Sequence, residues 1–81
     1  MNRQDVYKLI DGERDYQDKK WIRPESDVDH SIADWLIYME EMLIRAKKEL
    51  YFLKYDLALE FIRKLTALGV ACMECNETKS R

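Results

Sequence analysis

The sequence is poor in the residues that interrupt helices, since its 81 residues include only two glycines and one proline. Such a composition favours helices and argues against a turn-rich all-β fold. An excess of positive charge is also lacking, because the formal net charge is −2 at pH 7. Without a basic field, neither duplex nucleic acid nor an anionic membrane surface is an expected partner.

Long hydrophobic runs are absent as well. No segment approaches the run of about 18 apolar residues that can cross a bilayer, and the first residues lack the apolar core of a signal peptide. We therefore expect a cytoplasmic protein.

Cysteine and histidine are scarce. Cys72 and Cys75 form a lone C-x-x-C motif, which we interpret as two free thiols and not as a disulfide or a redox centre. His30 and Asp34 supply only two potential ligands, and a zinc or iron site needs more. The sequence predicts no metal site and no cofactor.

The residues that are present predict one helical domain over 1–81. With 47% hydrophobic and 37% charged residues, the chain reads as helices over 2–20, 31–53 and 56–74, followed by a polar tail over 76–81. Ser31 and Asp34 have the spacing of a capping box at the start of the second helix, and Asp56 is the expected N-cap of the third. Because almost no loop separates them, the second and third helices should form a long antiparallel hairpin on which the short first helix packs.

The helix over 31–53 carries apolar residues on several sides. One row alternates steps of four and three, and we expect it to face the partner helix of the hairpin. A second row consists of Trp35, Tyr38 and Met42, and a third row recurs every seven residues at Ile37, Ile44 and Tyr51. The members of the first row are Ile32, Leu36, Met39, Leu43, Ala46, Leu50 and Leu53.

The third helix has the same surplus of apolar faces. Its segment 67–73 is apolar all round, and the small Gly69 would let another backbone approach closely. One copy of so short a chain cannot bury all these faces, so we predict a homo-oligomer. The predicted interface residues are Trp35, Tyr38, Met42, Gly69 and Met73.

The first helix instead places polar groups on a face that should be buried. Burying them without partners costs a few kcal/mol, so they need internal ion pairs or a polar ligand. An ion-pair network, for example Glu13 with Arg63 or Lys64, and a ligand pocket both remain open. The residues on or beside this face are Glu13, Arg14, Gln17, Lys20 and Trp21.

A pocket built there would suit a nucleotide. Arginine and lysine neutralise phosphate, Tyr16 or Trp21 would stack on a base, and Gln17 would read a base or ribose edge. A Gly-rich phosphate loop and a nucleophile beside a base are missing, which favours a binding protein over an enzyme. The predicted ligand-binding residues are Arg14, Tyr16, Gln17, Lys20, Trp21 and Arg63, and no catalytic residue is predicted.

Several segments together resemble a family of small helical proteins encoded by tailed phages. The resemblance covers most of the chain and implies a viral origin more firmly than an activity. It rests on GERDYQ at 12–17 with Trp21, on HSI at 30–32 and WL at 35–36, and on RKL at 63–65 with VACME at 70–74.

Members of this family look distantly like the all-α nucleotide pyrophosphohydrolases of the MazG type. Those enzymes carry E-E-x-x-E followed by E-x-x-D. In this chain Glu40 and Glu41 are followed by Ile44, and no E-x-x-D comes after it. This departure from the motif argues against pyrophosphohydrolase activity.

Three functional hypotheses follow. The first is a phage-encoded helical homo-oligomer that sequesters a small nucleotide, such as an immune signal of the host. The second is a protein-binding module that inhibits a host or phage protein through the row of Trp35, Tyr38 and Met42. The third is a divergent nucleotide pyrophosphohydrolase.

Overall fold

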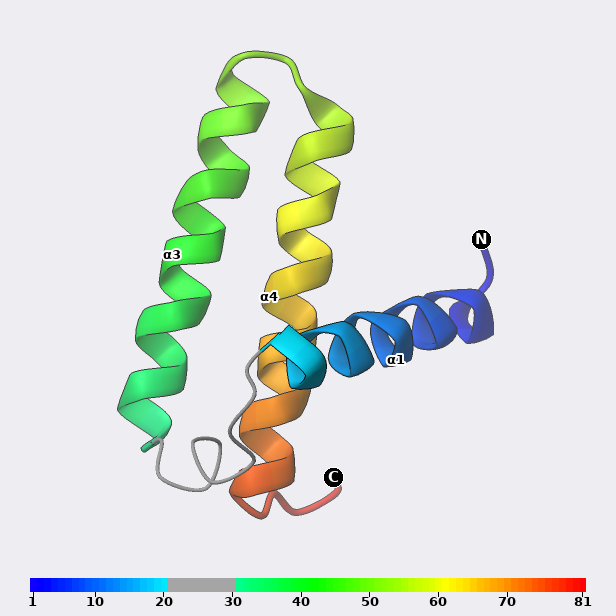
Figure 1. Ribbon diagram of the computed structural model, residues 1–81, viewed down its shortest axis with the longest axis vertical. Coiled ribbons are helices and arrows are strands. Elements are labelled where there is room, and N and C mark those ends of the chain that lie inside the picture. The colour runs from blue at the N-terminus through cyan, green and yellow to red at the C-terminus, as the bar shows by residue number, and fades with distance from the viewer. Residues whose placement is uncertain (21–30) are drawn as a thin grey trace.

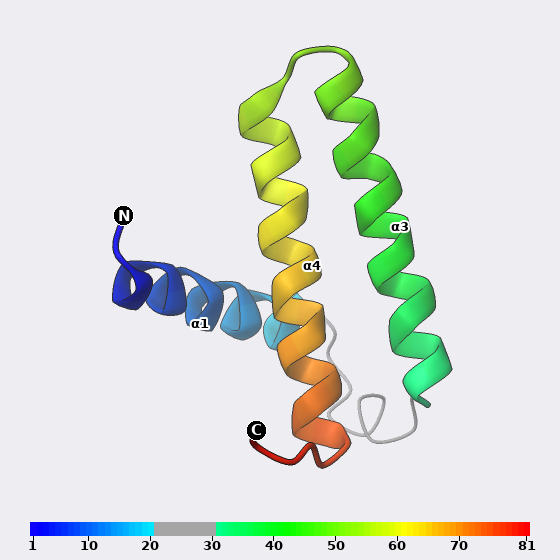
Figure 2. The same cartoon turned by 180° about the vertical axis from the view of Figure 1, so that it is seen from behind.

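A computed structural model describes residues 1–20 and 31–81, which form three helices: α1 (Arg3–Lys20), α3 (Ile32–Tyr51) and α4 (Tyr55–Cys75). Helices α3 and α4 run side by side in opposite directions and are joined by a tight turn (Figure 1). Helix α1 lies across α4, and its N-terminal half extends away from the other two helices, as the view from behind also shows (Figure 2). The prediction of an all-helical fold is confirmed for the described residues.

The start of α3 is set by a local signal. The Ser31 hydroxyl accepts a hydrogen bond from the Asp34 backbone N–H at 3.2 Å, and the Asp34 carboxylate accepts one from the Ser31 N–H at 3.0 Å. Two N–H groups that the helix leaves unpaired are thereby satisfied. The predicted capping box is confirmed.

The connection between α3 and α4 is a left-handed cap. Leu53 has φ 60°, the Leu53 N–H donates to the Leu50 carbonyl at 2.9 Å, and the Lys54 N–H donates to the Glu49 carbonyl at 2.9 Å. This Schellman arrangement ends α3 at Tyr51, two residues before the expected end. Helix α4 begins one residue before Asp56, the expected N-cap, which therefore lies in the first turn, where its charge favours the helix dipole.

The core between α3 and α4 is small and centred on Trp35. This side chain is 1% exposed and packs with the buried Leu68 and Ala71, while Met39 and Met42 pack against the edge of the cluster. Small residues are also buried along the two helices. They are Ala46 on α3 and Ala58, Ala67 and Ala71 on α4.

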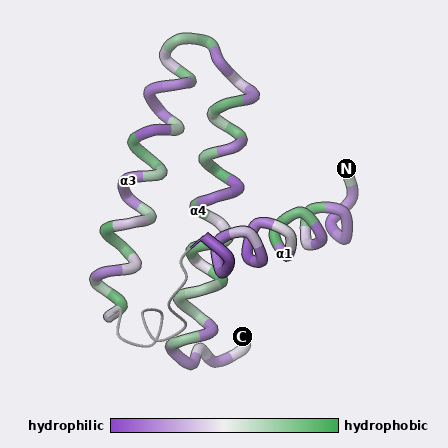
Figure 3. Tube along the Cα trace, viewed as in Figure 1, coloured by the Kyte–Doolittle hydropathy of each residue, from purple (hydrophilic) through white to green (hydrophobic). Residues whose placement is uncertain are grey.

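The face that α3 turns toward α4 differs from the expected one. Of the row predicted to face the hairpin partner, Leu36, Leu43 and Leu50 are exposed, as are Ile32 and Leu53. Met39 and Ala46 of this row do contribute to the core, and Trp35 and Met42 of the second row join them, because Trp35 buries more apolar surface than a leucine. Hydrophobic and hydrophilic residues therefore alternate along the outside of α3 (Figure 3).

Candidate functional site

Helix α1 meets α4 through buried polar residues. Its buried side chains are Glu13, Arg14 and Gln17, each 5–7% exposed. The sequence predicted polar groups on this face, and the structure places them against α4. They divide into a network around Arg14 and an ion pair of Glu13.

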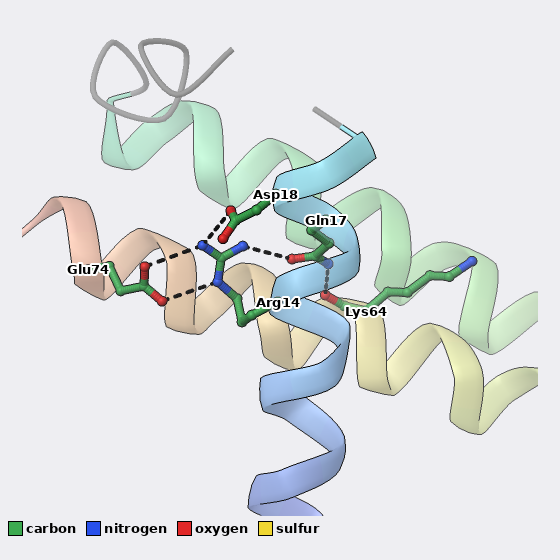
Figure 4. A network of polar contacts seen from close by, with 5 residues as sticks. All are labelled: Arg14, Gln17, Asp18, Lys64 and Glu74. Carbon is green, nitrogen blue, oxygen red and sulfur yellow. Dashed lines mark hydrogen bonds and ion pairs between the residues drawn. The ribbon is translucent and has the colours of Figure 1, made fainter. Parts of the chain in front are cut away.

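The Arg14 guanidinium lies among three side chains (Figure 4). Its Nε donates to Glu74 Oε1 at 3.2 Å, and its Nη2 donates to Glu74 Oε2 at 3.3 Å and to Asp18 Oδ1 at 3.0 Å. Its Nη1 donates to Gln17 Oε1 at 3.3 Å. The Gln17 amide in turn donates from Nε2 to the Lys64 carbonyl at 3.3 Å, so the network ties α1 to two separate turns of α4.

The neighbouring carboxylates keep Arg14 positively charged. Burial lowers the pKa of Arg14, but the hydrogen bonds and negative charges of Glu74 and Asp18 outweigh that effect and raise the pKa above its ordinary value. The guanidinium is therefore a permanent cation whose charge is already balanced by two carboxylates. Arg14 therefore ties α1 to α4, and its predicted role in ligand binding stays a prediction.

Glu13 forms an ion pair with Arg63. Arg63 Nε donates to Glu13 Oε1 at 2.7 Å, and the Glu13 side chain is 5% exposed against 35% for that of Arg63. The predicted ion pair of Glu13 across to α4 is confirmed. The second oxygen, Oε2, is buried and has no hydrogen-bond partner in the described part of the chain, so one strong acceptor remains unused.

A groove of about 640 Å³ opens between α1, α3 and α4, beside this ion pair. Four of the predicted ligand-binding residues line it, whereas Arg14 does not, and Trp21 lies outside the described residues. On α1, the residues common to the prediction and the groove lining are Tyr16, Gln17 and Lys20. The polar and aromatic lining residues are Glu13, Tyr16, Gln17 and Lys20 from α1, Tyr38, Glu41 and Arg45 from α3, and Phe61, Arg63 and Lys64 from α4.

The groove has an excess of positive charge, with four basic and two acidic lining residues. Arg63 is paired with Glu13, and Arg45 is paired with Glu41 at 2.8 Å. Lys20 and Lys64 form no ion pair with a carboxylate of residues 1–20 or 31–81. These two ammonium groups supply the uncompensated charge.

Aromatic rings lie next to these cations. Lys20 Nζ is 5.9 Å from the centroid of the Tyr16 ring, and Lys64 Nζ is 5.1 Å from that of Phe61. Arg45 lies over the same Phe61 ring at 6.0 Å. Figure 4 shows the Lys64 side chain extended away from the Arg14 network. The groove thus offers cations and flat apolar surfaces within reach of one small molecule.

Sequence reasoning missed the part that Phe61 and Arg45 play in this groove. Neither residue was among the predicted ligand-binding residues. One signal was available, since Phe61 and Lys64 are three residues apart and so share a helix face. The approach of Arg45 depends on how α3 packs against α4.

The predicted interface residues are not one exposed row. Trp35 is the most buried large side chain, and Met42 packs against its cluster. Tyr38 contacts the Trp35 ring edge-on, with centroids 6.3 Å apart. Tyr38 and Met42 also line the groove, so the row of Trp35, Tyr38 and Met42 faces inward and does not form an outer docking surface.

The two other predicted interface residues lie on α4. A Cβ on Gly69 would stand 3.5 Å from Met39 Cε, an ordinary contact, so this glycine adjoins α3 of its own chain. Met73 is exposed near the end of α4. Of the five predicted interface residues, Met73 is therefore the most exposed on the single chain.

Cys72 is half-buried and Cys75 is exposed, and the two are not joined by a disulfide. No cluster of three or more potential metal ligands occurs within residues 1–20 and 31–81, and His30 lies outside them. None of the described helices is long and apolar enough to cross a membrane. The chain matches no family model, no curated protein and no solved structure.

Proposed function

We propose that the chain is a binding protein that holds a small nucleotide in the groove between α1, α3 and α4 without turning it over. The observation that carries the proposal is the coincidence in one groove of exposed aromatic surface and two ammonium groups that form no ion pair within the described residues. Lys20 and Lys64 neutralise phosphate, and Tyr16, which is 57% exposed, stacks on the base.

The buried ion pair gives the groove a means of selection. Glu13 Oε2 is an acceptor without a partner, so a ligand with an N–H or O–H group there gains a charge-assisted hydrogen bond. Base amino groups and ribose hydroxyls are such donors. The Gln17 amide uses one N–H and one oxygen lone pair for contacts within the chain, and it keeps one of each with which to read a base or ribose edge in the groove that Gln17 lines.

The pyrophosphohydrolase hypothesis finds less support. Glu41 lines the groove but is paired with Arg45, and Glu40 is not among the lining residues. A magnesium ion that bridges phosphates needs carboxylates that face the substrate together. We therefore assign the groove to binding.

We further propose that the chain works as a homo-oligomer. Large apolar side chains remain exposed along all three helices, and a chain of this size has few means of stabilisation other than association. If the phage resemblance holds, a signalling nucleotide of a host defence is the ligand that such an oligomer would sequester. Inhibition of a host or phage protein is the second candidate, because the same exposed apolar side chains can dock on another protein.

Native mass spectrometry and calorimetry with a panel of linear and cyclic nucleotides test the proposal. We expect one nucleotide to be retained without a change of mass, and Lys20→Ala or Lys64→Ala to weaken its binding by about tenfold. Lys19→Ala is the matched control, since Lys19 is the exposed neighbour on α1 and does not line the groove. Equal losses in Lys19→Ala and Lys20→Ala, or hydrolysis of the nucleotide, would contradict the assignment.

A further inference from the structure

The side of α3 that faces away from α4 carries an apolar stripe. It consists of two adjacent large residues in each of three successive heptads, and every member is 44–81% exposed. At about 100° per residue, its midline lies on the opposite side of the helix from Trp35 and Met42, which face the core. We call this set the outer stripe: Leu36, Ile37, Leu43, Ile44, Leu50 and Tyr51.

Two charges of opposite sign lie on the midline of the outer stripe. Glu40 and Lys47 are both exposed, and neither forms an ion pair with another residue of the described ranges. An apolar partner surface would leave both charges desolvated without compensation, which is unfavourable. The partner of the outer stripe must therefore present the opposite charges at matching positions.

The outer stripe of a second copy that runs antiparallel presents the opposite charges at matching positions. Its centre lies between Leu43 and Ile44, with Glu40 and Lys47 at equal distances on the two sides. A two-fold axis through this point is the symmetry of an isologous dimer, in which the same surface meets itself. The facing pairs would be Leu43 with Ile44, Glu40 with Lys47, Ile37 with Leu50, and Leu36 with Tyr51.

We propose that α3 packs antiparallel against α3 of a second copy of this chain, with the two-fold axis between Leu43 and Ile44. Each Glu40 then pairs with Lys47 of the second copy, so the interface contains two ion pairs over an apolar centre. A parallel arrangement would place Glu40 beside Glu40 and Lys47 beside Lys47. Charge complementarity thus selects both the partner and its direction.

This dimer leaves the groove open. The residues that α3 contributes to the groove include Tyr38, Met42 and Arg45, which lie on the side of the helix away from the outer stripe. The inference rests on the proposed homo-oligomer but not on the nucleotide. Loss of the dimer and loss of ligand binding are therefore separable.

Charge reversal tests the register of the dimer. In sedimentation equilibrium, Glu40→Lys and Lys47→Glu should each weaken the dimer by at least about tenfold, because both ion pairs become repulsive. An equimolar mixture of these two variants should form a heterodimer as tight as the wild type, since every facing pair is again opposite in charge. The double variant E40K/K47E should restore the homodimer in the same way.

Lys8→Glu is the control for Lys47→Glu, because it makes the same change of charge at an exposed position of α1. Circular dichroism of each variant checks that the helices are intact. A chain that stays monomeric at every concentration overturns both the dimer and the proposed assembly. Self-association that persists in the single variants, or that the mixture fails to restore, overturns this interface alone. If the outer stripe instead docks on a different protein, the purified chain will stay monomeric.

Discussion

Helix α4 makes two contacts that differ in kind. With α3 it buries an indole among small and apolar residues, whereas with α1 it buries a guanidinium, a carboxylate and an amide. Burial of apolar side chains stabilises the packing of two helices but constrains their relative orientation weakly. Hydrogen bonds between buried charged groups add little net stability but constrain the orientation strongly. The α3 contact therefore supplies the stability, and the α1 contact sets the angle at which α1 closes the groove.

The largest effect is expected from breaking the apolar contact. Trp35→Ala should lower the free energy of unfolding by about 3–5 kcal/mol, because the cavity it leaves is lined by helices that cannot collapse fully. Urea denaturation followed by circular dichroism measures the loss. Leu59→Ala on the exposed side of α4 is the comparison, and its cost should stay below about 1 kcal/mol. Similar costs for the two variants would refute the assignment of the core.

Breaking the polar contact should have a smaller and more local effect. Arg14→Met should cost about 2 kcal/mol, because Gln17 loses a buried partner while Glu74 and Asp18 are half exposed and recover water. In hydrogen exchange, the amides of α1 should lose protection and those of α3 and α4 should keep it. Arg14→Lys should not rescue α1, since an ammonium cannot reproduce the fork of donors. Uniform loss of protection in all three helices would contradict this division.

Breaking the ion pair of Glu13 and Arg63 should change ligand binding. Glu13→Gln removes the charge that holds Arg63, so Arg63 becomes available in the groove. Affinity for inorganic pyrophosphate, a probe without a base or ribose, should rise several-fold. Calorimetry compares this variant with Asp11→Asn, which changes an exposed acid of α1 that does not line the groove. An equal rise in both variants would reflect net charge alone.

The smallest effect concerns the turn that joins α3 to α4. Leu53 is 70% exposed and has φ 60°, a conformation that glycine adopts without the steric cost of a side chain. Leu53→Gly should therefore raise the free energy of unfolding by about 0.5 kcal/mol. Phe52→Gly, at φ −90°, should instead lower it. The urea midpoints of the two variants should move in opposite directions.

Local signals could be predicted from the sequence, and the choice among apolar faces could not. The capping box of Ser31 and Asp34 needs only a four-residue segment, and it was predicted correctly. The polar face of α1 was also visible, because charged residues interrupt an apolar stripe. The face of α3 was predicted only in part, since three apolar rows compete. Met39 and Ala46 of the expected row are in the core, whereas its leucines are exposed and Trp35 is buried instead.

The candidate site shows the same limit. Gln17 and Lys20 were grouped by helical spacing within α1, Tyr16 was chosen as an aromatic that could stack on a base, and Arg63 was added as a cation from α4. The pairing of Arg14 with Glu74 could not be predicted, because Glu74 lies 60 residues away and becomes a neighbour only when α1 crosses α4. Which cations of the groove form ion pairs depends on how the three helices pack, so the sequence alone does not predict it.

The most direct test of the central claim is an NMR titration of the ¹⁵N-labelled protein with the nucleotide that native mass spectrometry retains. We predict that the amide shifts will concentrate on groove residues such as Tyr16, Lys20, Phe61 and Lys64, and will leave the outer stripe of α3 unchanged. Shifts that concentrate on the outer stripe, or that spread evenly over all three helices, would contradict a nucleotide site in this groove.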